Sequence, residues 1–334
     1  MKEFFEPTAL SESSKVLIRQ AIEIVDDYRT RGFILTLRQL YYQLVSKALI
    51  PNTEQSYKRV GSIISDARLC GYIDWSMIED RGRSCAVPNH LDDPEDIMDR
   101  CVDWFSKDLW EDQPWWILVM IEKDALSGFF DTVCSEAGVT FAANKGYSSS
   151  SQMLRIGKDI ESQMRNGKDI CIYYLGDHDP SGLDMTRDVE ERLKLFSGYT
   201  FWAPRKTKDE DKDYWDKAIT GLNPRHFQLY RNAKYEDRKF EVNRLALTMD
   251  QINEFNPPPN PAKVTDSRAK NYIELYGEDS WELDALDPDV MVSLVTDGIA
   301  ALKDDELWEE ATERMEEERR RFKACLDTAD RELL

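Results

Sequence analysis

Residues 170–182 read ICIYYLGDHDPSG, an apolar run that is followed at once by two aspartates, a proline and a glycine. A continuous apolar run of this length is typical of a strand that is buried on both faces, as in a parallel sheet. Residues 116–121 read WILVMI, and acidic residues follow this run too. Helical patterns come after the runs, at about 125–137 and 184–196. Strands that alternate with helices indicate an α/β fold with a parallel sheet.

Acidic side chains stand directly after both apolar runs. Glu122 follows the first run, and Asp177 and Asp179 follow the second. In a parallel sheet, ligands collect at the carboxyl ends of the strands, so we expect these three carboxylates to converge. Three carboxylates with no thiolate suit a hard cation, Mg²⁺ first and Mn²⁺ second, and do not suit zinc. Such an ion would polarise a phosphoryl oxygen and stabilise a leaving 3′-hydroxyl as alkoxide.

Two other interpretations of residues 177–182 use no such site. The order Asp-x-Asp-x-Ser-Gly also opens a calcium-binding EF-hand loop, but that loop needs a preceding helix and an apolar residue where Asp184 stands. The other alternative is a turn in which the aspartate side chains cap backbone N–H groups and the proline and glycine favour the turn conformation. His178, between the two aspartates, is interpreted as an oriented group beside the site or as a surface group, in preference to a metal ligand.

The N-terminal part predicts three helices, at about 10–31, 36–48 and 55–70. Thr36 and Gln39 have the spacing of a capping box at the start of the second helix. A break precedes the third helix, and a helix, short turn and helix with basic residues on the second member is typical of a helix-turn-helix. A plain helical bundle with solvated basic residues is the alternative. The basic residues that would meet DNA are Lys58, Arg59 and Arg68.

The charge balance is strongly acidic, with a formal net charge of −20. That balance alone argues against a nucleic-acid-binding protein, because phosphate binding depends on Lys and Arg. The charges are unevenly distributed, however. Residues 28–68 carry seven basic against two acidic side chains, whereas residues 275–334 carry 7 basic and 19 acidic. The basic stretch therefore coincides with the expected DNA-reading helices.

With 334 residues, the chain is long enough for two domains. We expect a helical or winged-helix DNA-binding domain at 1–110 and an α/β domain at 111–334. Within the second, residues 204–240 are expected to form a polar loop or insertion, 257–261 an extended proline-rich connector, and 289–334 C-terminal helices. No apolar run is long enough for a membrane span and no signal peptide is evident. The six cysteines lack metal-binding spacing, and we interpret them as reduced thiols of a cytoplasmic protein.

Three motifs in this order resemble a known family. They are Glu122-Lys123-Asp124-Ala125, Asn144-Lys145-Gly146-Tyr147, and the glycine-flanked acidic segment 176–182. Together they look like a Toprim domain, and more narrowly they resemble the A subunit of DNA topoisomerase VI and the related meiotic double-strand-break transesterase. The segment 281–286, WELDAL, is similar to a late motif of those A subunits. The resemblance covers about residues 30–190.

The resemblance implies a fold and a reaction. Those families place a winged helix before the Toprim domain, with an Arg-x-x-Tyr-Tyr helix whose second tyrosine is the nucleophile. Here LRQLYY at residues 37–42 stands in that place, and Tyr42 matches the nucleophile. Tyr42 would attack a phosphate of double-stranded DNA to give a 5′-phosphotyrosyl link. Lys123 and Lys145 would contact phosphate. In the family, tyrosine and metal come from different protomers, which implies a homodimer.

A phenol with a pKa of about 10 is a poor nucleophile at neutral pH, so it needs a cationic neighbour or a metal. Arg38 stands four residues before Tyr42, on the same face of the expected helix, and can supply charge to the phenolate or to the scissile phosphate. No Gly-x-x-x-x-Gly-Lys-Ser/Thr loop occurs in the sequence. An ATPase activity would therefore come from a separate partner, as in topoisomerase VI.

The residues leave three functions open. The first is magnesium-dependent DNA cleavage by tyrosine transesterification. The second is a Toprim nuclease of the plasmid- or phage-defence type, which keeps the metal site and uses water as nucleophile. The third is a non-catalytic DNA-binding protein with a degenerate Toprim domain.

Overall fold

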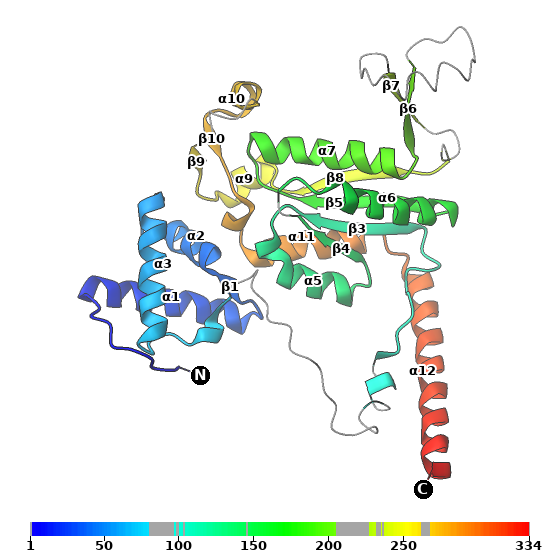
Figure 1. Cartoon of the computed structure of the whole chain (residues 1–334), viewed down its shortest axis with the longest axis horizontal. Coiled ribbons are helices and arrows are strands. Elements are labelled where there is room, and N and C mark those ends of the chain that lie inside the picture. The colour runs from blue at the N-terminus through cyan, green and yellow to red at the C-terminus, as the bar shows by residue number, and fades with distance from the viewer. Residues whose placement is uncertain are drawn as a thin grey trace.

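The computed structural model describes residues 2–79, 97, 100–102, 104–144, 146–204, 227–231, 235, 237–261 and 268–333. Helices cover a central sheet, and three more helices form a cluster beside it (Figure 1). The described residues are thus of the α/β class, as expected.

The central sheet has four strands in the order β4-β3-β5-β8, and every neighbouring pair is parallel. The strands are β3 (Trp115–Ile121), β4 (Thr140–Ala143), β5 (Asp169–Leu175) and β8 (Phe240–Ala246). Both expected strands, β3 and β5, are confirmed. They lie side by side in the middle of the sheet with Ile121 opposite Leu175, so they end at the same level.

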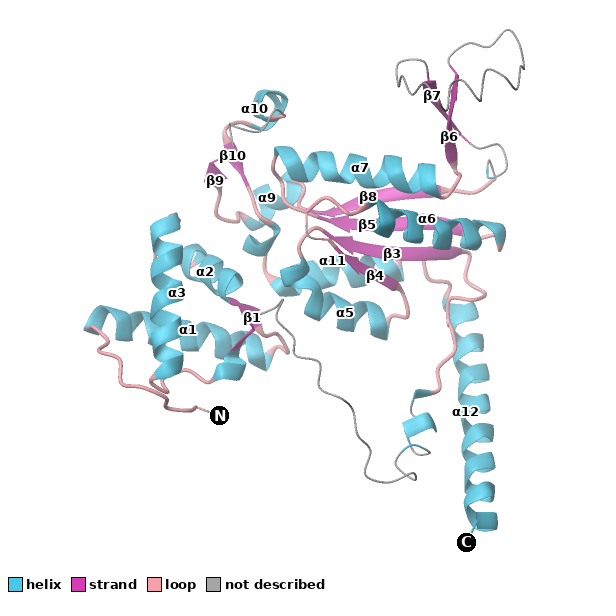
Figure 2. Cartoon of the chain, in the orientation of Figure 1, coloured by secondary structure: helices cyan, strands magenta, loops and turns pink. Residues whose placement is uncertain are grey.

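Helices cover both faces of this sheet (Figure 2). On one face lie α5 (Ser127–Glu136) and α11 (Pro288–Ala300), and on the other lie α6 (Ser150–Arg165) and α7 (Pro180–Phe196). Side chains alternate along β3, so that Val119 and Ile121 pack towards the first pair of helices while Leu118 and Met120 pack towards the second. Burial on both faces explains why β3 and β5 are continuous apolar runs.

The N-terminal helices have a hydrophobic core of their own. They are α1 (Glu12–Thr30), α2 (Leu37–Ser46) and α3 (Glu54–Leu69), and each matches an expected helix closely. Thr36 caps α2 and forms the expected capping box with Gln39. A two-residue strand β1 (Leu35–Thr36) pairs in parallel with β2 (Ile78–Glu79). A wing after α3 would fall on residues 80–96, which lie outside the described residues.

The N-terminal helices contact the α/β part through residues that are distant in sequence. Tyr28 donates a hydrogen bond to Asp287, and Arg31 pairs with Asp287 and Asp289 at the start of α11. Phe33 packs edge-on against Phe129 of α5, with ring centroids 5.9 Å apart. Together these contacts fix the orientation of α1 and α2 relative to the sheet.

Smaller elements complete the described chain. They are η1 (Trp75–Met77), η2 (Asp124–Leu126), β6 (Thr200–Pro204), β7 (Phe227–Arg231), α9 (Met249–Phe255), β9 (Asn260–Pro261), α10 (Ala269–Tyr276), β10 (Asp279–Ser280), η5 (Leu283–Ala285) and α12 (Asp305–Leu333). The long helix α12 projects away from the sheet (Figure 1). Among the described helices, none combines the length and the apolar character that crossing a bilayer requires.

The structure differs from the sequence expectations at the start of one helix and in one strand. The helix expected at 184–196 begins earlier, at Pro180, because Asp179 caps it and proline is favoured in the first helical turn. Strand β8 was not expected, because its apolar and polar residues alternate only over 240–243 and Arg244 breaks the pattern. Most of 204–240 lies outside the described residues, although β7 in this stretch forms an antiparallel pair with β6.

Packing of α6 against the end of α7 leaves no room for a side chain at Gly157. A Cβ atom there would lie 2.6 Å from the Cβ of Phe196 and 2.9 Å from its backbone carbon. We expect Gly157→Ala to lower the free energy of unfolding by about 1 to 3 kcal/mol, measured by urea denaturation, because the two helices would have to move apart.

The matched control is Gly61→Ala in the interior of α3, where the nearest atom to a new Cβ is the flexible end of Leu37 at 3.4 Å. This change should stabilise the protein by up to about 1 kcal/mol, the helix-propensity difference between the two residues. Equal effects of both substitutions would contradict the close helix contact.

Candidate functional site

Glu122 and Asp177 lie side by side at the carboxyl ends of β3 and β5. The backbone N–H of Glu122 donates to the carbonyl of Leu175 (2.9 Å), which extends the pairing of the two strands by one residue. The backbone N–H of Asp177 in turn donates to Oε2 of Glu122 at 2.8 Å. The structure therefore brings these two predicted site residues together.

The two carboxylates share a buried position, and each residue is only 7% exposed. Burial raises the pKa of Glu122 to about 7, and the nearby charge of Asp177 adds to the effect. Burial also raises the pKa of Asp177, although the Lys123 ammonium opposes that shift. The pair therefore binds a proton more readily than two solvated carboxylates would.

Two glycines allow the Glu122 carboxylate to approach the backbone so closely. A Cβ atom at Gly176 would lie 2.6 Å from Glu122 Oε2. A Cβ atom at Gly182 would lie 2.2 Å from the carbonyl oxygen of Asp177 and 3.1 Å from Glu122 Oε2. Both glycines of the segment 176–182 are thus required for steric reasons at the site itself.

Asp179 has a different environment from Glu122 and Asp177. Its Oδ1 accepts hydrogen bonds from the backbone of Gly182 (2.6 Å) and the hydroxyl of Ser181 (3.0 Å), so it serves as the N-cap of α7. Within the described ranges, no group of three His, Cys, Asp or Glu residues is placed to hold a metal ion. We expected three carboxylates to converge. In the structure Glu122 and Asp177 lie together, and Asp179 lies at the start of α7 as its N-cap.

Lys123 places an ammonium group among three carboxylates, one of which is Asp177. Its Nζ lies 2.8 Å from Asp177 Oδ1, 3.0 Å from Glu282 Oε2 and 2.7 Å from Asp284 Oδ2. Burial disfavours the charge, but the three carboxylates outweigh it and raise the pKa of Lys123. Lys123 was expected to contact phosphate, and in this arrangement its partners are acidic side chains of the same chain.

Glu282 and Asp284 are site residues that sequence reasoning did not assign. The segment containing them runs along the end of β5, where His178 and Trp281 form an antiparallel bridge and Leu283 N–H donates to Asp177 Oδ1 at 2.8 Å. The acidic pattern of WELDAL was the available signal. It was noted only as part of the family resemblance, because an acidic segment 100 residues downstream has no local feature that places it at the sheet.

His178 is buried beside the acidic residues, and its side chain contacts two tyrosines. Its Nδ1 lies 2.9 Å from the hydroxyl of Tyr272, and its ring packs edge-on against Tyr276. Burial lowers the pKa of His178 to about 4, so the ring is neutral at pH 7. The ring is thus buried and held in one orientation by Tyr272 and Tyr276, and it does not lie at the surface.

Arg244 of β8 holds the loop that carries the aspartates. Its guanidinium donates to four backbone carbonyls, those of Gly176, Asp177, Gly182 and Leu247. Buried carbonyls on an irregular loop need such partners, and one planar guanidinium supplies several donors at once. Arg244 therefore fixes the backbone around the carboxylate pair, a role that the sequence analysis did not predict.

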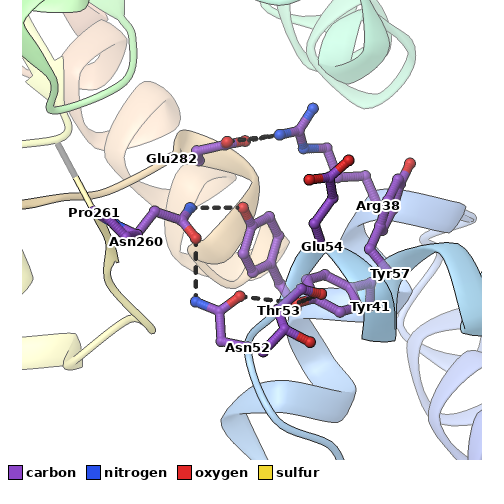
Figure 3. Close-up of a pocket in the computed structure, with 10 residues that line it drawn as sticks. Arg38, Tyr41, Asn52, Thr53, Glu54, Tyr57, Asn260, Pro261 and Glu282 are labelled. Atoms are coloured by element: carbon purple, nitrogen blue, oxygen red, sulfur yellow. Dashed lines mark hydrogen bonds and ion pairs between the residues drawn. The ribbon is translucent and has the colours of Figure 1, made fainter. Parts of the chain in front are cut away.

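Tyr42 lies on α2 at the wall of a pocket between the N-terminal helices and the connector at 259–261. The residue is 3% exposed, and its hydroxyl accepts a hydrogen bond of 3.0 Å from Asn260 Nδ2. The pocket has a volume of about 460 Å³. Its lining residues are Arg38, Tyr41, Tyr42, Asn52, Thr53, Glu54, Tyr57, Asn260, Pro261 and Glu282 (Figure 3).

The phenol of Tyr42 is protonated in this environment. Burial raises its pKa to about 12, and the charge of Glu282 contributes in the same direction, while Asn260 and Arg38 oppose the shift. Arg38 has the expected position beside Tyr42, but its guanidinium donates to Glu282 Oε1 at 2.6 Å (Figure 3). The cation that would activate the tyrosine is therefore largely neutralised by a carboxylate.

Glu282 connects the tyrosine pocket with the acidic pair. Its carboxylate contacts Arg38 on one side and Lys123 on the other, and Lys123 in turn contacts Asp177. The tyrosine pocket and the carboxylates of a single chain are thus joined through charged side chains.

The residues expected to contact DNA are placed differently from one another. Lys58 and Arg59 are exposed on α3, where Lys58 pairs with Glu54 at 2.6 Å. Arg68 is only 8% exposed, and its guanidinium donates to the backbone carbonyls of Trp75 and Ile78. We therefore leave Arg68 out of any DNA-contacting surface. Lys145 lies outside the described residues.

Comparison with protein-family models, with curated proteins and with solved structures found no match for this chain.

The raised pKa of Glu122 makes stability depend on pH. A carboxyl whose pKa is higher in the folded than in the unfolded state stabilises the fold while protonated, and this contribution is lost as pH rises from about 4.5 to about 7. We expect the wild type, in EDTA, to lose on the order of 2 kcal/mol more than Glu122→Gln between about pH 5 and about pH 8. Urea denaturation at the two pH values measures the difference.

Glu136→Gln is the matched control for this experiment, because Glu136 is an exposed carboxylate on α5. Its pH profile should run parallel to that of the wild type. If the profile of Glu122→Gln is parallel as well, the fold does not raise the pKa of Glu122.

Proposed function

We propose that this chain is a magnesium-dependent DNA-cleaving protein that combines a helix-turn-helix of the winged-helix type with a Toprim-type acidic site. The observation that carries the proposal is the burial of both carboxylates at the carboxyl ends of adjacent parallel strands, where Glu122 accepts a hydrogen bond from the backbone N–H of Asp177 and the charge of Asp177 contributes to the raised pKa of Glu122. Two like charges that are held together at this edge of a parallel sheet favour a bound divalent cation.

The side chains present fit such an ion. Mg²⁺ is commonly held by one or two carboxylates and keeps several of its waters, so the Glu122 and Asp177 pair is a sufficient anchor. Asp179 is the third proposed ligand. It uses Oδ1 for its helix-capping contacts in the described structure, and so Oδ2 is left for an ion or for one of its waters. When bound, the ion would polarise a phosphoryl oxygen and stabilise a leaving 3′-oxygen.

Tyr42 is the proposed nucleophile, which would form a 5′-phosphotyrosyl link with one strand of double-stranded DNA. Its hydroxyl borders an open pocket that also contains Arg38, so a phosphate in this pocket would lie next to both groups. Arg38 would have to exchange Glu282 for the phosphate, because the pKa of the phenol is raised in the present arrangement. Action as a homodimer and cooperation with a separate ATPase belong to the same proposal and rest on the resemblance alone.

A specific observation favours a second candidate, a nuclease that uses water. Tyr42 is almost fully buried and its pKa is raised to about 12, whereas the carboxylate pair depends on no feature of the tyrosine. A hydrolytic Toprim nuclease would retain the metal site, and Tyr42 would then only pack between α2 and the connector at 259–261.

Covalent capture distinguishes the two candidates. We expect wild-type protein incubated with supercoiled plasmid and Mg²⁺ to cleave the DNA, and rapid denaturation to leave protein attached to the 5′ ends. Asp177→Asn should reduce cleavage by about a thousandfold or more, because a metal ligand is lost. Tyr42→Phe should abolish the covalent adduct, because the attacking oxygen is gone.

The controls are Asp159→Asn and Tyr72→Phe, which make the same chemical changes at exposed positions. Cleavage without an adduct, unaffected by Tyr42→Phe, would replace the transesterase by the water-using nuclease. Full cleavage by Asp177→Asn would remove both candidates.

The DNA-contacting surface is proposed to include the exposed residues Lys58 and Arg59 of α3. Replacing both by alanine should weaken binding to duplexes of any sequence, because these residues would contact phosphate. It should also lower the slope of log affinity against log salt concentration by about 2, or about 1 for each lost phosphate contact. Fluorescence anisotropy at several salt concentrations measures both quantities.

The double substitution Lys158→Ala with Arg165→Ala removes the same charge from α6 and is the control. If the two double variants show the same salt dependence, α3 does not carry the DNA surface.

A further inference from the structure

The Glu282 carboxylate lies between two cations from distant parts of the chain. Arg38 Nη2, from α2, lies 2.6 Å from Oε1, and Lys123 Nζ, at the end of β3, lies 3.0 Å from Oε2. Arg38 Nη2 also lies 2.5 Å from Oε2, so the carboxylate receives charge-assisted hydrogen bonds from two different parts of the molecule. Glu282 is also one of the residues that line the tyrosine pocket (Figure 3).

We propose that Glu282 is an internal substitute for a nucleic-acid phosphate, occupying an anion site formed by Arg38 and Lys123, and that a DNA phosphate binds there by displacing it. This inference rests on the proposed function and assigns the residue that controls access of substrate to the site.

A phosphate group has the chemistry to take the place of this carboxylate. Both groups offer two oxygens to a guanidinium, and Arg38 is suited to either because its donors form a planar fork. Lys123 supplies a compact charge that accepts either anion. An open pocket of about 460 Å³ adjoins Glu282, so the incoming phosphate has a route that does not pass through the core.

Glu282 is better suited to leave than the neighbouring acidic residue. Its side chain is 23% exposed, whereas that of Asp284 is completely buried. Asp284 therefore stays with Lys123 when Glu282 swings away, and the ammonium keeps Asp284 and Asp177 as partners. One oxygen of Asp284, Oδ1, has no hydrogen-bond partner within the described residues. This carboxylate is therefore buried with unused capacity to hold a cation.

Displacement also changes the environment of Tyr42. The charge of Glu282 contributes to the raised pKa of the phenol, and Arg38 opposes it. Moving the carboxylate away while a phosphate is held by Arg38 would place the phosphorus beside the tyrosine hydroxyl. The contact between Glu282 and Arg38 would then prevent activation of the tyrosine until DNA is bound.

The test is DNA binding by Glu282→Gln in EDTA, where no cleavage occurs. Glutamine has the same shape and can still accept hydrogen bonds, but it carries no charge to compete with a phosphate. We expect Glu282→Gln to bind a short fluorescein-labelled duplex about tenfold more tightly than the wild type. Inorganic phosphate should raise its thermal unfolding midpoint more than it raises that of the wild type.

The matched control is Glu278→Gln, which removes the same charge from an exposed position in the same segment. It should have little effect on affinity. The double variant Arg38→Gln with Glu282→Gln should lose the gain in affinity, because the proposed anion site needs Arg38.

Unchanged or weaker binding by Glu282→Gln, or an equal gain with Glu278→Gln, would overturn the inference and make Glu282 a purely structural link. This result is independent of the cleavage experiment, since it is measured without metal. Tighter binding without any cleavage by the wild type would leave the anion site standing and remove the nuclease and transesterase functions.

Discussion

The ammonium group of Lys123 lies where three parts of the chain meet. It follows β3 directly, contacts Asp177 after β5, and binds Glu282 and Asp284 from a segment more than 150 residues downstream. Without a cation at this point, several buried carboxylates would repel one another at considerable cost in free energy. Because Glu282 also binds Arg38 of α2, the same charge network fixes the N-terminal helices against the carboxyl edge of the sheet. The geometry of the tyrosine pocket depends on it.

The loop that carries Asp177 is held in place by contacts outside this charge network. Arg244 supplies donors to the carbonyls of the loop at 176–182, and two glycines let the Glu122 carboxylate approach the same loop. The loop is therefore held from both sides before any ligand arrives. Preorganised groups of this kind cost little further ordering when they bind an ion or a phosphate. The carboxylates, the lysine and the pocket wall thus act as a single unit.

The sequence predicted the central part of this arrangement well. The apolar runs of β3 and β5 and the capping box of α2 are local patterns, and strand ends in a parallel sheet meet by geometry, so Glu122 and Asp177 could be placed together in advance. Asp179 was harder to place, because the same residue that suits a metal also suits a helix N-cap. The cap is satisfied in the described structure.

Other features could not be predicted because they depend on contacts between distant residues. Arg68 looks like a surface cation of a DNA-reading helix, but the loop that follows α3 folds over it and takes its hydrogen bonds. Strand β8 keeps the alternation of apolar and polar residues only as far as Asn243, and Arg244, which breaks it, is explained only by the carbonyls that surround it. The roles of Glu282 and Asp284 depend on a chain path of more than 150 residues from Lys123. No local pattern contains that information.

The uneven distribution of charge has one more consequence. The basic stretch at 28–68 belongs to the N-terminal helices, whereas α12, with eleven acidic and six basic residues, projects from the other side of the sheet (Figure 1). Charge is thus distributed asymmetrically, since residues 2–79 carry ten basic and ten acidic side chains whereas acidic side chains predominate in α12. A polyanion approaching it would experience a torque that turns the N-terminal helices towards it and α12 away. This orientation would operate only over distances comparable to the Debye length, about 10 Å at 0.1 M salt, and so it would weaken as ionic strength rises.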